Sequence, residues 1–166
     1  MKPSLLLPGA LILGGCIIAG ALYFALRPES APTPAADLSR IRPVSEDDHM
    51  LGNPAAPIVF VEYCDIDAPF CENWDGVLKT VMANYGASGQ VAWVYRHLPI
   101  VNQHPNAETA AEAAECAASA GGSAAFFAFV DAAAHAPQNA QSGLPDYGAA
   151  ARAAGVDPAQ LSSCLS

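Results

Sequence analysis

Two short runs of β-branched and aromatic residues, at positions 58–63 and 91–96, constrain the fold more than any other feature of this chain. Each run is typical of a buried strand. Between them, apolar residues recur at the spacing of one helix face and end before Gly86: Phe70, Trp74, Val77, Leu78, Val81 and Tyr85. A strand, a helix and a strand with short joints predict parallel pairing through a right-handed crossover. The sequence therefore predicts an α/β domain, with Trp74 and Trp93 packed in its core.

After His104-Pro105 the composition changes to alanine-rich helix. Asn106 can cap the first of these helices, which Gly121-Gly122 should interrupt, and Pro158 suits the first position of the last one. We expect four helical segments, at residues 106–119, 124–134, 146–154 and 158–165.

The amino-terminal segment carries no charged residue from position 5 to position 26. At about 1.5 Å per residue, such a run is long enough to cross a hydrocarbon core of roughly 30 Å. Lys2 precedes it, whereas Glu29 follows Arg27 at close distance, so the charge bias favours a cytoplasmic amino terminus. Residues 1–26 are thus predicted to be a single-pass anchor in a bacterial inner membrane, with the rest of the chain in the periplasm.

Two other interpretations of this segment stay open. Leu13-Gly14-Gly15-Cys16 is similar to a lipoprotein cleavage box, and Ala19-Gly20-Ala21 is similar to a signal-peptidase site. The anchor is favoured because apolar sequence continues about ten residues beyond Cys16.

A proline-rich stretch separates this segment from the predicted domain. Four prolines between positions 27 and 43 favour an extended spacer, so we assign a linker to residues 27–45 and a folded domain to residues 46–166. The formal charge of −9, with 7 Lys and Arg against 16 Asp and Glu, gives no basic patch for nucleic acid. Neither a glycine-rich phosphate loop nor a paired metal-ligand spacing among His49, His97, His104 and His135 is present, so no cofactor or metal is expected.

Five ordered segments of the predicted domain resemble one known family. Residues 48–52, 61–65, 68–71, 95–99 and 104–107 are similar, in order and spacing, to the DsbA-like branch of the thioredoxin superfamily. The resemblance covers roughly residues 45–166. It implies a thioredoxin-like α/β fold with an inserted helical lobe, and a role in disulfide formation in exported proteins.

The resemblance also locates the residues that would carry the chemistry. In that family a Cys-Pro-Phe-Cys motif begins the first helix, where unpaired N–H groups and the helix dipole stabilise the attacking thiolate. Here Ala68 stands at the attacking position, Pro69 and Phe70 match the spacers, and Cys71 matches the buried partner. Glu62 matches the buried acid of the relatives. Because a methyl group cannot attack a disulfide, ordinary exchange is expected to be impaired.

The end of the chain is a second departure from the family pattern. Relatives continue after a Cys-Leu that corresponds to Cys164-Leu165 with a cis-proline loop, two strands and a helix, whereas this sequence ends at Ser166. We therefore expect a domain that is incomplete at its carboxyl terminus and leaves one edge of the first strand unpaired. A homo-oligomer or a second chain that completes the sheet is one way to cover that edge.

The cysteines outside the amino-terminal segment allow three pairings. Relatives often carry cysteines at the positions of both Cys116 and Cys164, which lie in predicted helices of one lobe, so we expect a structural disulfide there. Cys64 then faces Cys71 either as a displaced redox pair or as a small core residue beside a relic. Two functions follow as hypotheses: residual thiol chemistry on exported client proteins, or a non-catalytic accessory or binding subunit of a membrane-associated complex.

Overall fold

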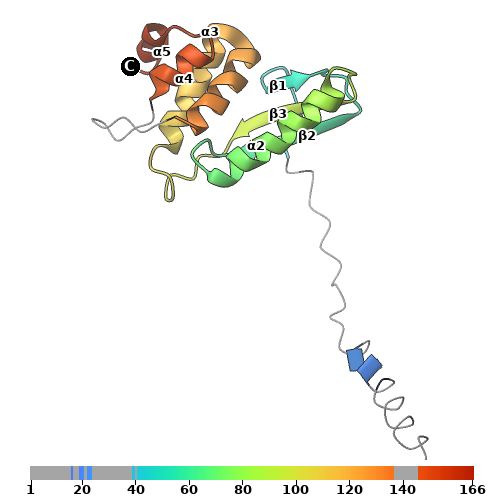
Figure 1. The fold of residues 1–166 in the computed structure, drawn as a ribbon. Coiled ribbons are helices and arrows are strands. Elements are labelled where there is room, and N and C mark those ends of the chain that lie inside the picture. Colours follow the sequence, from blue (N-terminus) through green and yellow to red (C-terminus); the bar gives the residue numbers. More distant parts are fainter. Residues whose placement is uncertain (1–15, 17–18, 21, 24–38, 40, 137–145) are drawn as a thin grey trace, which may run out of the picture. The chain divides into compact units, whose positions relative to one another are not determined.

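The computed structural model describes residues 16, 19–20, 22–23, 39, 41–136 and 146–166 (Figure 1). Its contacts divide the chain into Met1–Arg42 and Pro43–Ser166, of which the second is the folded domain. The predicted anchor at residues 1–26 and the linker at residues 27–45 lie mostly outside the described residues.

A three-stranded sheet in the order β1-β3-β2 forms the centre of the domain. Strand β2 (Ile58–Cys64) pairs in parallel with β3 (Val91–His97), and this confirms the predicted crossover. Strand β1 (His49–Gly52), which the sequence pattern did not predict, runs antiparallel on the other side of β3. Strand β3 is therefore central in the described sheet, and its first six residues are buried.

Strand β2 differs from the expectation of a fully buried strand. It has a paired neighbour on one side only among the described residues, so it forms an edge of the sheet. Ile58, Phe60 and Tyr63 are exposed, whereas Glu62 and Cys64 are buried. Hydrophobic content predicted the strand but not its partial exposure, whereas its unpaired edge agrees with the expectation drawn from the family resemblance.

The helix after β2 is rotated relative to its predicted orientation. Helix α2 (Pro69–Val81) continues into a π-helical turn, η2 (Met82–Gly86), and its buried residues are Cys71, Asp75 and Leu78. These lie four and three positions apart and so share one face. Phe70, Val77 and Tyr85 of the predicted stripe are exposed, and Trp74 is 41% exposed, so its expected core position is wrong.

The helical lobe consists of α3 (Ala107–Ala134), α4 (Tyr147–Ala153) and α5 (Pro158–Cys164). The predicted interruption is confirmed as a kink inside α3, where Gly122 has a φ of 66°. Helix α3 is long and apolar enough to cross a membrane by length and composition, but half of the stretch that passes this test is buried within the domain. Phe126 and Phe129, both fully buried, belong to that core.

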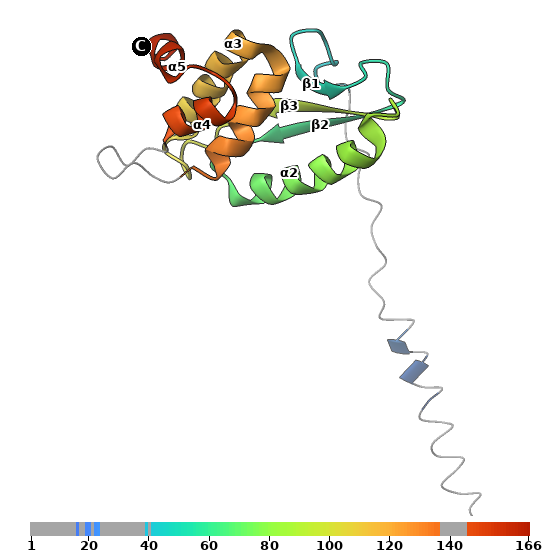
Figure 2. The same cartoon turned by 45° about the horizontal axis from the view of Figure 1, so that its top comes forward.

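The lobe and the amino-terminal end of α2 lie at the same end of the sheet (Figure 2). Both strands of the parallel pair point toward this end, so the β2–α2 connection faces the lobe. In folds built from parallel strands, functional residues gather where the strands end.

A buried ion pair attaches the start of the domain to the sheet. Arg96 on β3 donates from Nε and Nη2 to the two carboxylate oxygens of Asp48, at 2.8 and 2.9 Å. The same guanidinium donates to the Tyr63 hydroxyl and to the Pro43 carbonyl, so it also connects β3 to β2. Such two-pronged contacts fix geometry well because the guanidinium is planar and rigid.

Candidate functional site

Ala68, which the sequence resemblance matches to the attacking cysteine, stands immediately before α2. Its backbone is extended, with φ −86° and ψ 120°, and Pro69 occupies the first helical position. Pro69 has no N–H, and the Cys71 N–H donates to the Ala68 carbonyl at 2.9 Å, so the helix dipole, with the Phe70 N–H, is what would stabilise an anion here. The alanine methyl group offers no atom that can carry that charge.

Cys64 and Cys71 form a disulfide with their Cα atoms 5.8 Å apart. It joins the last residue of β2 to the first turn of α2. The two residues are only 5% and 8% exposed, and the Asp65 backbone N–H donates to Cys71 Sγ at 3.3 Å. The structure thus brings both cysteines together at the junction of β2 and α2, next to Ala68 in the chain.

A pair of buried carboxyl groups, Glu62 and Asp75, lies beside this disulfide. Glu62 is two residues before Cys64 on the same face of β2, and Asp75 is one helical turn after Cys71. Trp93 Nε1 donates to one Glu62 oxygen at 2.9 Å, while the other Glu62 oxygen and one Asp75 oxygen have no donor. Burial, with the nearby charge of Asp75, raises the pKa of Glu62 to about 8.

Burial also raises the pKa of Asp75 to about 6, which leaves Glu62 as the protonated member at neutral pH. The Glu62 proton then supplies the donor that the two free oxygens lack. Asp75 was not identified from the sequence. The sequence feature that could have identified it is its spacing: Asp75 comes four positions after Cys71 and so lies on the same face of the helix, which the structure buries.

The raised pKa of Glu62 predicts a specific pH dependence of stability. The folded state binds the Glu62 proton up to about pH 8 and the unfolded state only to about pH 4.5, so stability falls as pH rises between these values. Glu62→Gln removes this loss, since glutamine accepts from Trp93 and donates to Asp75 without ionising. Relative to wild type, the variant should gain about 3 kcal/mol in free energy of unfolding between pH 5 and pH 8.

Urea unfolding at pH 5, 6.5 and 8 measures this gain. Glu108→Gln is the matched control, because Glu108 is exposed on α3 and should leave the pH dependence unchanged. Parallel pH curves for wild type and Glu62→Gln would contradict the assignment.

The loop between β2 and α2 is held by Asp65, which is only 2% exposed. Its carboxylate accepts from the Ile100 backbone N–H at 2.9 Å, from His104 Nδ1 at 2.8 Å and from the Asp67 N–H at 3.0 Å. Burial and the charge of Asp65 raise the pKa of Asp67. These contacts fix the loop whose N–H reaches the Cys71 sulfur.

A groove of about 340 Å³ runs beside the disulfide, between β2 and α2. Four of its lining residues, at positions 61–64, are consecutive in β2. Because successive side chains of a strand point to opposite faces of the sheet, a groove that touches all four runs along the edge of β2. It is lined by Val61, Glu62, Tyr63, Cys64, Phe70 and Trp74.

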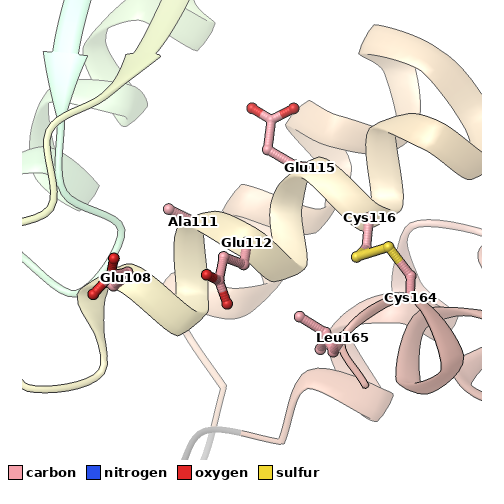
Figure 3. Close-up of a pocket in the computed structure, with 7 residues that line it drawn as sticks. All are labelled: Glu108, Ala111, Glu112, Glu115, Cys116, Cys164 and Leu165. Atoms are coloured by element: carbon pink, nitrogen blue, oxygen red, sulfur yellow. A yellow bond between two sulfur atoms is a disulfide. The ribbon is translucent and has the colours of Figure 1, made fainter.

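The second disulfide, Cys116–Cys164, joins α3 to α5 with its Cα atoms 5.8 Å apart. Figure 3 shows this bridge beside a hollow lined by Glu108, Glu112 and Glu115 of α3. Glu115 lies 3.0 Å from His49 and 3.2 Å from His97, and its contacts with these two side chains lower the pKa of Glu115 to about 2.

The remaining histidines also pair with acidic groups. His104 binds Asp65, and His135 lies 3.1 Å from Glu72. Within the described part of the chain, no group of three His, Cys, Asp or Glu side chains could hold a metal ion.

Comparison with known proteins identifies the fold. A family model described as thioredoxin matches residues 44–166. DsbA2 of Pseudomonas aeruginosa is 28% identical with a TM-score of 0.58, over 75% of this chain and 65% of that one. A thioredoxin-like oxidoreductase from Silicibacter pomeroyi is 27% identical with a TM-score of 0.57, over 73% and 64%. Alpha-DsbA1 of Wolbachia pipientis, at 21% identity and a TM-score of 0.60, shares the fold.

Curated relatives of similar sequence carry a different name. Na(+)/H(+) antiporter NhaA 1 of Mycolicibacterium gilvum is 36% identical over 111 residues, which are 64% of this chain and 18% of the antiporter. The corresponding protein of Mycobacterium sp. strain KMS is 41% identical over 93 residues, 55% of this chain and 15% of that one. The chain thus spans less than a fifth of the length of these relatives.

Proposed function

Because the chain belongs to the thioredoxin family and is a DsbA-like member of it, we propose that it exchanges disulfides with exported proteins through Cys64–Cys71. This pair takes the place of the one that Ala68 disrupts. The observation that carries the proposal is the disulfide itself, which lies between the end of β2 and the start of α2 beside Glu62 and Asp75.

Exchange through this pair is slow compared with that of a complete helix-tip motif. Both cysteines are buried, and the residue immediately before α2 is Ala68, which has no thiol group. The protonated Glu62 supplies a nearby proton donor and acceptor for sulfur groups that gain or lose charge away from water. The domain is thus a weakened relative rather than an efficient oxidant.

A second candidate function is that of a non-catalytic accessory or binding subunit. Ala68 favours it, and so do the exposed Phe70 and Trp74 at the groove, because exposed aromatic residues are typical of binding surfaces. An oligomer or a second chain that pairs with β2 belongs to this candidate.

The location that we propose is the periplasmic face of a bacterial inner membrane, with residues 1–26 as a single-pass anchor. The uncharged run at positions 5–26 supports it, and the similarity to segments of proteins named antiporters is in line with a membrane-associated partner. Protease accessibility in intact cells and in spheroplasts tests this location, since only spheroplasts should allow cleavage of the domain.

A single-turnover oxidation of a dithiol peptide separates the two functions. The full-length chain carrying Cys16→Ala, which removes the exposed free thiol, should oxidise one peptide dithiol per Cys64–Cys71 disulfide. The same chain with Cys64→Ala and Cys71→Ala should oxidise none. A peptide that stays reduced beside the intact disulfide would reject the redox function, and binding of a cysteine-free peptide by both chains would then support the binding subunit.

A further inference from the structure

We infer that a client thiolate enters the groove between β2 and α2, attacks the sulfur of Cys64, and displaces Cys71 as the leaving group. This inference rests on the proposed function and assigns separate roles to the two cysteines. In this inference Cys64, the last residue of β2, is the cysteine that forms the mixed disulfide with the client.

The lining of the groove favours Cys64 as the attacked residue. The lining includes Cys64 but not Cys71, although the two are bonded to each other. The whole-residue exposure of Cys71, 8% against 5%, points weakly the other way. The contact of the sulfur itself is more relevant, because the Asp65 N–H lies 3.3 Å from Cys71 Sγ and occupies part of its surroundings.

The same contact makes Cys71 the better leaving group. As the S–S bond breaks, negative charge collects on the departing sulfur. On Cys71 this charge would be stabilised by the hydrogen bond from the Asp65 N–H and by the dipole of α2, because Cys71 lies in the first turn of that helix. A lower thiol pKa speeds departure, so the bond should open toward Cys71.

The atoms and electrons of the proposed turnover balance. The first client thiolate bonds to Cys64 Sγ, and the Cys64–Cys71 bond breaks with its electron pair on Cys71. A second client thiolate then attacks the first client sulfur, forms the client disulfide and releases Cys64. The two protons of the client thiols end on Cys64 and Cys71, so the client loses two electrons and the protein gains them.

The groove wall indicates the kind of peptide that fits. Phe70 is 77% exposed, Tyr63 43% and Trp74 41%, so three aromatic side chains border the entrance. The only ionisable carboxyl group in the lining is Glu62, which is neutral below about pH 8. The substrate class is therefore an extended segment in which apolar or aromatic residues flank the cysteine.

A rapid-quench experiment tests the assignment. The oxidised full-length chain with Cys16→Ala is mixed with a single-cysteine peptide of Phe-Cys-Leu type, quenched in acid, and alkylated with N-ethylmaleimide before peptide mapping. We expect the peptide on Cys64 and the maleimide on Cys71. The peptide on Cys71 would overturn the inference and leave the proposed function standing, whereas no adduct at either cysteine would overturn both.

Groove variants test the route independently. Trp74→Lys should slow attack by the Phe-Cys-Leu peptide about tenfold, because it removes an aromatic wall. Attack by 2-mercaptoethanol, which makes no contact with the wall, should change less than about twofold. Val77→Lys is the matched control, since Val77 is 49% exposed on the same helix but does not line the groove. Equal slowing of both thiols by Trp74→Lys would contradict the proposed route.

Discussion

The double substitution Ala68→Cys and Cys64→Ala is expected to accelerate disulfide exchange by the full-length chain on the order of a hundredfold. It places a thiol immediately before α2 and pairs it with Cys71 three residues later. At that position the helix dipole lowers the thiol pKa, so the new sulfur leaves readily when a client takes over the disulfide. Ala68 is half-buried, whereas Cys64 and Cys71 are buried, so a thiol at position 68 is also easier for a client to reach. Reduction of insulin and oxidation of a dithiol peptide measure the gain.

Two matched variants make this result specific. Ala68→Ser with Cys64→Ala adds a hydroxyl group of similar size and should give no acceleration, because an alcohol forms no disulfide. Ala68→Cys alone keeps Cys64 as a competitor for Cys71, so we expect an intermediate rate. A folded double variant that forms the 68–71 disulfide and still reacts no faster than wild type would show that more than the sulfur is missing.

The fold was largely predictable because its signals are local. The two apolar runs, the helical spacing between them and the Gly121-Gly122 interruption each act within a few residues, and they gave the parallel strand pair and the kinked lobe. The prediction that a nucleophile is missing at the start of α2 also rests on local sequence, since it needs only the comparison of Ala68-Pro69-Phe70-Cys71 with the family motif.

The orientation of α2 could not be predicted, because two faces of this helix have the same period. Phe70, Trp74 and Val77 form the more apolar face, and Cys71, Asp75 and Leu78 lie one position further along. The structure buries the second face, on which the Cys64–Cys71 bond joins the first turn to β2 and Leu78 packs in the core. Apolarity alone favoured the wrong face.

The polar pairs of the site depend on contacts between distant positions. Glu62 meets Trp93 across the parallel strands, and His49 and His97 meet on Glu115 of α3. Each partner is an ordinary strand or helix residue by itself. Such pairs follow from the strand register and the packing of the lobe, neither of which a single sequence specifies.

Removal of the second disulfide by Cys116→Ala and Cys164→Ala should lower the free energy of unfolding by about 4 kcal/mol. The bridge closes a loop of 48 residues between α3 and α5, and the loss of such a constraint increases the entropy of the unfolded chain. The effect is a large part of the stability of a domain of this size. Chemical denaturation of the oxidised proteins, with thiol quantification to confirm that the remaining disulfide is intact, measures the difference.

The first disulfide supplies the comparison that tests the physical reason. Cys64–Cys71 closes a loop of only 7 residues, so the same entropy relation gives about 2.4 kcal/mol for Cys64→Ala with Cys71→Ala. The longer loop should therefore cost about 1.7 kcal/mol more than the shorter one when each pair is removed alone. A larger loss on removing the short loop would mean that burial of sulfur beside Glu62 outweighs chain entropy. The stabilising role would then belong to the candidate redox pair, and its reduction by a client would loosen the junction of β2 and α2.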